Sequence, residues 1–290
     1  MRWVPLGGLV LIQIGYPLTH GDARAGLVVT TVLLGFAISV GHALATRGAR
    51  VAVALVVVAG AGGLAVEALG VRTGFPFGRY AYSGALGPRL FGVPLVIPLA
   101  WAWMAWPAWL AAARLTRPRA GRTARARTGL AGAGLAGTRL GRTGLGRTGL
   151  GRAGLGRAGL GRAGLGRAVV RIALAGLGLA AWDLFLDPQM VAAGYWRWRH
   201  PTPGLAGIPY TNYLGWLVVA VLMMALFAAV AGSRVRVGGP GVDAPMSALY
   251  LWTYLSSVLA HAVFLGLPGS AAAGAVGMGL VAVPLAVALW

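Results

Sequence analysis

The sequence has 290 residues, of which 58% are hydrophobic and only 10% are charged, and it contains no cysteine. The lack of cysteine excludes disulfides, thiolate nucleophiles, iron–sulfur clusters and cysteine-based zinc sites. The formal net charge of +20 would suit a nucleic-acid-binding domain, but 14 of the 25 basic residues lie between Arg114 and Arg171, in a stretch without acids. The charge therefore belongs to one segment of an otherwise apolar chain.

Eight apolar stretches follow one another along the chain. They cover residues 3–19, 25–45, 51–70, 91–113, 169–187, 213–232, 247–267 and 270–290. A helix needs about 20 apolar residues to cross the hydrocarbon core of a bilayer, and prolines interrupt the last two stretches. The sequence predicts an all-α, polytopic transmembrane helical bundle of seven or eight spans, placed in the cell membrane and surrounded by membrane lipids.

Residues 114–168 form a low-complexity segment rich in Arg and Gly, whose second half repeats the unit GRTGL or GRAGL. Five residues advance a helix by about 500°, so successive Arg side chains would not share a face. Each Gly also costs a helix about 1 kcal/mol relative to Ala. We therefore expect a flexible linker, not a helix, between membrane parts 1–113 and 169–290. Deletion of residues 128–166 is expected to leave activity largely intact.

Nucleic acid is not a predicted partner of this linker. Proteins that hold single-stranded nucleic acid stack its bases on aromatic side chains, and residues 114–171 contain none. Basic residues accumulate in cytoplasmic loops, which predicts a cytoplasmic linker in contact with anionic head groups. The connections 20–24, 71–90 and 188–211 are then external.

The few ionisable or amide side chains within the spans gather toward their external ends. Glu67 lies near the end of the third stretch, and Asp183 and Asp187 share one helical face at the end of the fifth. Asn212 opens the sixth stretch, and His261 lies in the outer third of the seventh. An acid at membrane depth is costly and by default marks function, although helix capping and snorkelling at the interface are an alternative. The pattern predicts one site at the external end.

Both long external loops are rich in Gly, Pro and aromatic residues. The loop 71–90 carries Tyr80 and Tyr82, and the loop 188–211 carries Trp196 and Trp198. One interpretation is an aromatic belt at the membrane interface. The other is a pair of structured loops that form a wall over an apolar pocket with the acids at its head.

The sequence lacks several motifs that mark known classes of enzyme, and their absence limits the reactions to be considered. The four histidines form no HxxxH or HxxHH box, which argues against the di-iron membrane hydroxylases and desaturases. There is no GxSxG elbow, and GAGLAG at 132–137 follows no strand, so neither a serine hydrolase nor a nicotinamide enzyme is indicated. Two possibilities remain: acid–base chemistry by carboxyl groups on a lipid-soluble substrate, or Mg²⁺-diphosphate chemistry through Asp183 and Asp187.

The same two regions carry a more specific pattern. It reads E-x-x-G-x-x-T-G-x-P-F-G-x-Y-x-Y at 67–82 and G-P-x-L-x-G-V-P-x-x-I-P at 87–98, then D-x-x-x-D-P-x-M-V at 183–191, W-x-W at 196–198 and G-I-P-x-x-N-x-x-G-W at 207–216. In these stretches the chain resembles the integral-membrane carotenoid biosynthesis family that includes the carotenoid 1,2-hydratases of the bacterioruberin and myxol-type pathways. Two departures are Leu205-Ala206, where aromatic residues are expected, and the Arg-rich repeat.

The resemblance implies addition of water across the terminal C1=C2 double bond of an acyclic carotenoid, which leaves a tertiary alcohol. Such a reaction needs a carboxylic acid as proton donor, a carboxylate as base and no metal or redox cofactor. Asp183 and Asp187 are the predicted acid/base pair, with Glu67 as their partner or as the proton donor itself. Asn212 is expected to position the water, and the substrate-binding residues are Tyr80, Tyr82, Trp196, Trp198 and His261.

Three alternatives remain open from the sequence. A membrane prenyltransferase would use Asp183 and Asp187 to hold Mg²⁺ against a diphosphate, and an end-group cyclase would use the same acids without adding water. A non-enzymatic carotenoid-binding membrane subunit would tolerate neutralisation of the acids. Metal dependence, product analysis and pigment content separate the three.

Overall fold

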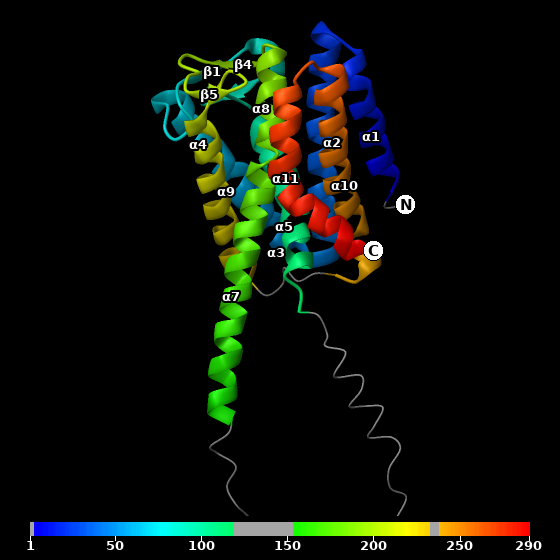
Figure 1. The fold of residues 1–290 in the computed structure, drawn as a ribbon, viewed down its shortest axis with the longest axis vertical. Helices are drawn as coiled ribbons and strands as arrows, with labels where there is room; N and C mark the ends of the chain where they lie inside the picture. The colour runs from blue at the N-terminus through cyan, green and yellow to red at the C-terminus, as the bar shows by residue number, and fades with distance from the viewer. Residues whose placement is uncertain (1–2, 119–152, 233–237) are drawn as a thin grey trace, which may run out of the picture.

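The computed structural model of the chain describes residues 3–118, 153–232 and 238–290. Helices make up nearly all of its regular structure (Figure 1). They are α1 (Val4–Gly15), α2 (Gly21–Arg47), α3 (Ala49–Leu55), α4 (Gly62–Thr73), α5 (Val96–Leu115), α7 (Ala153–Ala180), α8 (Asp183–Ala192), α9 (Tyr210–Ala231), α10 (Pro240–Leu259) and α11 (Pro268–Leu289). The short helical segments η1 (Tyr16–Leu18), η2 (Val56–Ala61), η3 (Gly84–Leu86) and η5 (Ala260–Phe264) lie beside or between them.

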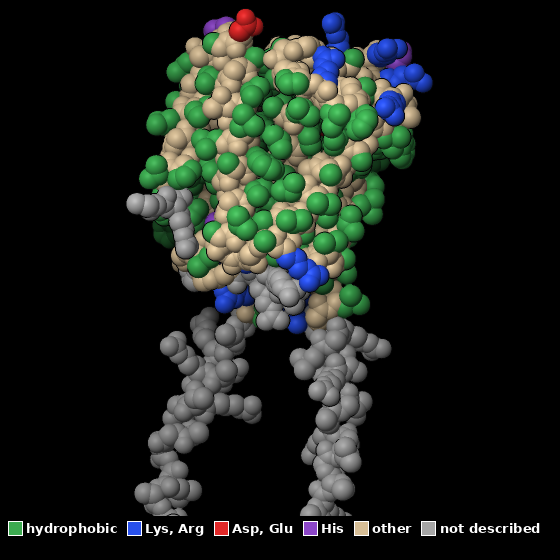
Figure 2. All heavy atoms as spheres, turned by 180° about the vertical axis from the view of Figure 1, so that it is seen from behind, with side chains coloured by type: hydrophobic (Ala, Val, Ile, Leu, Met, Phe, Trp, Pro, Cys, Tyr) green, Lys and Arg blue, Asp and Glu red, His purple; other side chains and the backbone are tan. Residues whose placement is uncertain are grey.

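Seven helical segments are long and apolar enough to cross a membrane. They are Gly21–Arg47, Ala49–Thr73, Val96–Leu115, Gly164–Ala192, Tyr210–Ala231, Gly241–Phe264 and Pro268–Leu289. The first predicted stretch forms a shorter apolar helix, Val4–Leu18. On the face seen in Figure 2, hydrophobic side chains cover the body of the molecule and Arg side chains gather at its two ends. These features confirm the all-α membrane bundle predicted from the sequence.

Helix α5 is the centre of the bundle. It is buried along almost its whole length, including Trp101, Trp103, Trp106 and Trp109, and it packs against α2, α7 and η2. A helix that is apolar on all sides is stable only when other helices surround it. The four tryptophans therefore provide packing surface for different neighbours.

The prediction that the Arg-rich repeat is not helical is wrong for its last part, because α7 begins at Ala153. The repeat unit changes from GRTGL to GRAGL at residue 151, and Ala is a much better helix former than β-branched Thr. The helix also continues from an apolar span, so its extension requires no new nucleus. Residues 119–152 lie outside the described residues. A deletion of 128–166 would therefore remove the first turns of α7.

The two aromatic loops, 71–90 and 188–211, meet in a short antiparallel ladder. Strand β1 (Tyr80–Tyr82) pairs with β4 (Trp196–Trp198), and the amide of Ser83 donates to the carbonyl of Tyr195 at one end of the ladder. The strands lie at one end of the bundle, while α7 extends beyond the other end (Figure 1). The ladder thus joins segments that lie more than a hundred residues apart in the chain.

After the ladder, each loop continues through a hairpin of the same design. Strands β2 (Arg89–Leu90) and β3 (Val93–Pro94) form the first, and β5 (Gly204–Leu205) and β6 (Ile208–Pro209) form the second. The two turn residues of each hairpin, Phe91-Gly92 and Ala206-Gly207, have positive φ, as a two-residue type I′ turn requires. The sequences LFGVP and LAGIP are correspondingly alike, and each is followed seven residues later by a tryptophan, Trp101 in α5 and Trp216 in α9.

Candidate active site

The β1–β4 ladder directs four aromatic side chains to one face. Because side chains alternate along a strand, Tyr80 and Tyr82 lie on the same side as their partners Trp198 and Trp196, while Ala81 and Arg197 are exposed on the other. The ring centroids of Tyr82 and Trp196, and of Tyr80 and Trp198, are each 5.5 Å apart. The loops therefore form a structured aromatic wall, as the second interpretation of their sequence expected.

Glu67 lies under this wall, in the middle of α4, and is 3% exposed. Tyr80 and Tyr82 donate hydrogen bonds to its Oε2, the latter at 2.8 Å. The indole of Trp101 donates to its Oε1 at 3.3 Å. Burial, together with the negative charge of Glu67, raises the pKa of both tyrosines far above the ordinary value of 10.0. The tyrosines are thus neutral donors, and three neutral donors favour the ionised form of Glu67.

A glycine makes the approach of Tyr80 possible. A Cβ atom at Gly70 would lie 2.9 Å from the hydroxyl of Tyr80 and 2.9 Å from Cδ2 of Phe77. Gly70 lies three residues after Glu67 on α4, so it occupies the same face of that helix. The glycine therefore leaves the space through which the tyrosine reaches the carboxyl group.

Asp183 and Asp187 face the same region from the start of α8. The helical path is interrupted at Ala181 and Trp182 between α7 and α8, and the two acids follow on one face. The amide nitrogen of Asn212, in the first turn of α9, donates to Oδ2 of both, at 3.0 Å to Asp183. Trp196 donates from Nε1 to Oδ1 of Asp187 at 3.1 Å. Oδ1 of Asp183 is buried, and no group among the described residues donates a hydrogen bond to it.

A cavity of about 20 Å³ separates Glu67 from the aspartate pair. Asp187 and Asn212 line it together with Glu67, whereas Asp183 lies behind them. Its remaining walls are mainly aromatic and include the four aromatic residues of the ladder, Phe77, Trp101 and Trp216. This volume accommodates about one water molecule. In the part of the chain that the structure describes, no three His, Asp or Glu side chains are arranged to hold a metal ion.

The structure does not bring His261 to this cavity. Its Nδ1 is 2.8 Å from the hydroxyl of Ser270 and its Nε2 is 3.2 Å from Oε1 of Gln189. The ring also packs edge-on against Phe185, with centroids 5.2 Å apart. His261 therefore joins α8, η5 and the start of α11 on another side of α8.

Sequence reasoning missed Trp101 and Trp216 as site residues. Their rings stack in parallel with centroids 4.1 Å apart, and both line the cavity. The signal was available, because each tryptophan follows the same hairpin motif at the same spacing. Neither tryptophan is placed by its own loop alone, since the stack requires α5 and α9 to lie side by side.

Comparison with known proteins agrees with this geometry. A profile described as carotenoid biosynthesis protein matches residues 26–139 and 144–284. A curated relative, the bisanhydrobacterioruberin hydratase of Haloarcula japonica, is 27% identical over 163 residues. That match covers 56% of this chain but only 40% of the relative's length. No solved structure matches the chain. Because the profile covers most of the sequence, including every residue that lines the small cavity, the chain belongs to the carotenoid biosynthesis protein family.

Proposed function

We propose that the protein hydrates the terminal C1=C2 double bond of an acyclic carotenoid end group to a tertiary alcohol. The observation that carries this proposal is the cavity between Glu67 and Asp187, which is walled by aromatic rings and has the volume of one water molecule. Carboxyl groups on two sides of a water-sized space suit a reaction that adds one proton and one hydroxyl group.

The hydrogen bonds of Glu67, Asp183 and Asp187 suggest a different role for each acid. Glu67 accepts hydrogen bonds from three neutral donors, which offset part of the cost of burying a carboxylate, and it is the proposed base. Asp183 and Asp187 both accept a hydrogen bond from the amide of Asn212, so their carboxyl groups lie close together. Two buried carboxyl groups in this position resist joint ionisation, because like charges repel. One proton shared by this pair would also satisfy Oδ1 of Asp183. Asp187, which reaches the cavity, is therefore the proposed proton donor, and Asp183 is a positioning residue.

In the proposed reaction, the π electrons of C1=C2 take the proton of Asp187, so that a C2–H bond forms and C1 becomes a tertiary cation. Aromatic faces such as Trp196 and Trp198 stabilise such a cation by up to about 2 kcal/mol each. A lone pair of the water then forms the C1–O bond, and Glu67 accepts the proton that the water loses. Solvent entering the cavity returns this proton from Glu67 to the aspartate pair, which balances the cycle.

The cavity walls favour this chemistry over the alternatives. A diphosphate substrate needs cations around its oxygens, but the described lining contains no basic side chain. Cyclisation leaves no role for a space that fits a water molecule next to Asn212. Both arguments support hydration.

The test is to express the full chain in a host that makes acyclic carotenoids and to grow parallel cultures in water enriched in heavy oxygen. We expect a product heavier than its precursor by one water per reacted end, with the oxygen derived from solvent. Oxygen derived from O₂, a product isomeric with the precursor, or dependence on a prenyl diphosphate would refute the proposal. Each of these results would identify one of the competing reactions.

A further inference from the structure

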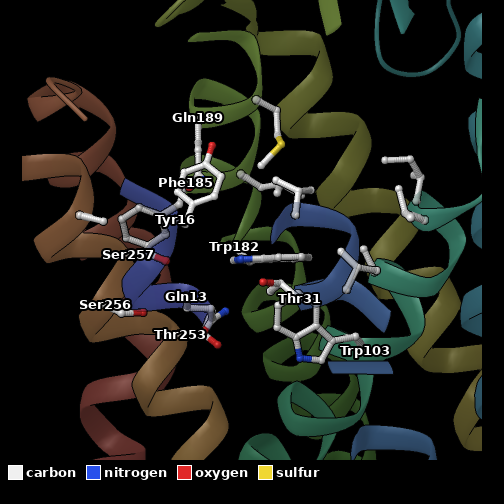
Figure 3. Close-up of a pocket in the computed structure, with 18 of the residues that line it drawn as sticks. Gln13, Tyr16, Thr31, Trp103, Trp182, Phe185, Gln189, Thr253, Ser256 and Ser257 are labelled. Carbon is white, nitrogen blue, oxygen red and sulfur yellow. The ribbon is translucent and has the colours of Figure 1, made fainter. Parts of the chain in front are cut away.

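A second and larger cavity, of about 130 Å³, lies beside the carboxylate cavity. It is enclosed by α1, α2, α5, α8 and α10 (Figure 3). In the close-up, Trp182 lies across its middle, with Phe185 and Trp103 on either side. Apolar cavities of this size class hold a benzene-sized ligand, so the space suits roughly one isoprene unit. The carboxylate cavity, at about 20 Å³, is much smaller and accommodates about one water molecule.

The two cavities share one wall. Ile97, Ala100, Leu186 and Trp196 line both of them. Ile97 follows Pro94 at the same spacing at which Asn212 follows Pro209. Ile97, the apolar residue of this equivalent pair, thus lines the larger cavity, whereas Asn212, the polar residue, donates hydrogen bonds to the two aspartates.

Helix α8 presents a different face to each cavity. Phe185, Leu186 and Gln189 line the larger one, as Trp182 does from the residue before the helix. Asp183 and Asp187 are turned toward Asn212. Residues three and four apart share a helical face, so a ligand in the larger cavity would lie against the same helix that carries the proposed proton donor.

The lining of the larger cavity has no charged side chain among the described residues, and its polar groups are neutral. On the side formed by α2 and α10, Thr31, Ser256 and Ser257 are only half-buried. Leu255 and Leu259, on the outer face of α10, are 61% and 56% exposed. Since both helices are long enough to span the membrane, this side is expected to face lipid rather than water.

We propose that the larger cavity binds the polyene segment next to the reacting end group, and that the substrate enters it from the bilayer on the side where α1 packs against α2 and α10. This inference rests on the proposed function, because the end group must then pass the shared wall to reach Asp187. The aromatic rings of Trp182 and Trp103, which pack edge-to-face at 5.4 Å, are suited to contact a conjugated chain.

The test uses a cavity-filling variant and a matched control on the same helix. Ser257→Phe places a ring in the cavity, whereas Leu259→Phe places it on the exposed face. Each purified full-length protein is loaded with an acyclic carotenoid, and bound pigment is measured by absorbance. We expect Ser257→Phe to bind at least tenfold less pigment than the wild type, and Leu259→Phe and Asp187→Asn to bind as the wild type does. Thr31→Phe, from the opposite wall, should repeat the loss if Ser257→Phe does not fold.

A second arm uses a short acyclic isoprenoid with the same end group. Ser257→Phe should slow hydration of this short substrate at least threefold less than hydration of the long one, because the short substrate passes through the larger cavity without filling it. Normal pigment binding by both filling variants, or equal loss of short and long substrates, would overturn the inference. A third result is possible: the wild type binds the pigment, Ser257→Phe does not bind it, and neither protein hydrates it. This result would support the binding site and refute the proposed function.

Discussion

Replacing Asp187 by Asn removes the proposed proton donor and keeps nearly the same side-chain volume. In the native site, Oδ1 of Asp187 accepts from Trp196 and Oδ2 accepts from Asn212. An amide has only one oxygen to accept with, so in either orientation one of these two hydrogen bonds is lost. Because Asp187 carries the proton in the proposed pair, the lost hydrogen bond joins neutral groups and contributes about 0.5–1.5 kcal/mol.

The catalytic effect is expected to be larger than the structural one. General acid catalysis contributes about 10²–10⁴ in rate, which corresponds to about 2.7–5.5 kcal/mol in activation free energy. Asp187→Asn should therefore lower the rate at least 100-fold while the protein still folds. Asp183→Asn should have a smaller effect, because Asp183 does not line the cavity and acts only through its neighbour.

The assay is the initial rate of alcohol formation by each variant in proteoliposomes, measured by liquid chromatography and mass spectrometry. Thermal unfolding in the same detergent reports on folding. Asp22→Asn is the matched control, since it removes one carboxylate from an exposed position in the first turn of α2. A folded Asp187→Asn protein that keeps more than a tenth of the wild-type rate would refute the assignment. So would an Asp183→Asn protein that is more impaired than Asp187→Asn.

The remaining predictions concern the supporting residues. Tyr82→Phe should slow hydration about 10–150-fold, because it removes one donor of about 1.5–3 kcal/mol from Glu67, and a change below threefold in the measured rate would contradict this. The raised pKa of Tyr82 means that the folded protein holds the phenolic proton more tightly than the unfolded chain. The free energy of unfolding should therefore fall as pH rises above about 10, and it should fall less steeply in Tyr82→Phe. If Tyr82 instead ionised in the folded protein, the tyrosinate absorbance of the folded wild type would exceed that of the folded variant, and this result would contradict the prediction. Gly70→Ala should impair activity by crowding Tyr80, whereas Gly62→Ala, whose Cβ would have no neighbour closer than 3.9 Å, should not. Asp243→Asn should destabilise the fold by about 3–5 kcal/mol in chemical denaturation, because it breaks a buried pair with Arg47 at 2.6 Å, yet the folded enzyme should keep its rate.

Local sequence was sufficient to identify the membrane helices. The length and hydropathy of an apolar stretch decide whether it crosses a bilayer as a helix, and both can be read from the composition of the stretch alone. Composition was a poor guide for the Arg-rich repeat. There the exchange of Thr for Ala and the continuity with a stable span favoured helix from Ala153 onward, although each glycine opposes it.

The acids of the candidate site were also recognisable from the sequence, because charged residues at membrane depth are rare and costly. Their neighbours were not. Nothing in the chain near Glu67 indicates that Trp101 donates to it, or that Trp216 stacks on that indole. His261 shows the limit of depth as a signal, since its position along the span matched that of the acids but its ring contacts Ser270 and Gln189 and does not line the small cavity.

The sequence by itself determined which segments enter the membrane, which acids lie near one end of the bundle and which loops carry aromatic residues. These properties follow from hydropathy and helical periodicity, which act within a single segment. Only the tertiary structure decided that β1 pairs with β4, that Asn212 bridges two aspartates and that a larger cavity adjoins the carboxylates. The physical reason is that these features depend on how α5, α8 and α9 pack side by side, and packing is set by side chains that meet from distant parts of the chain.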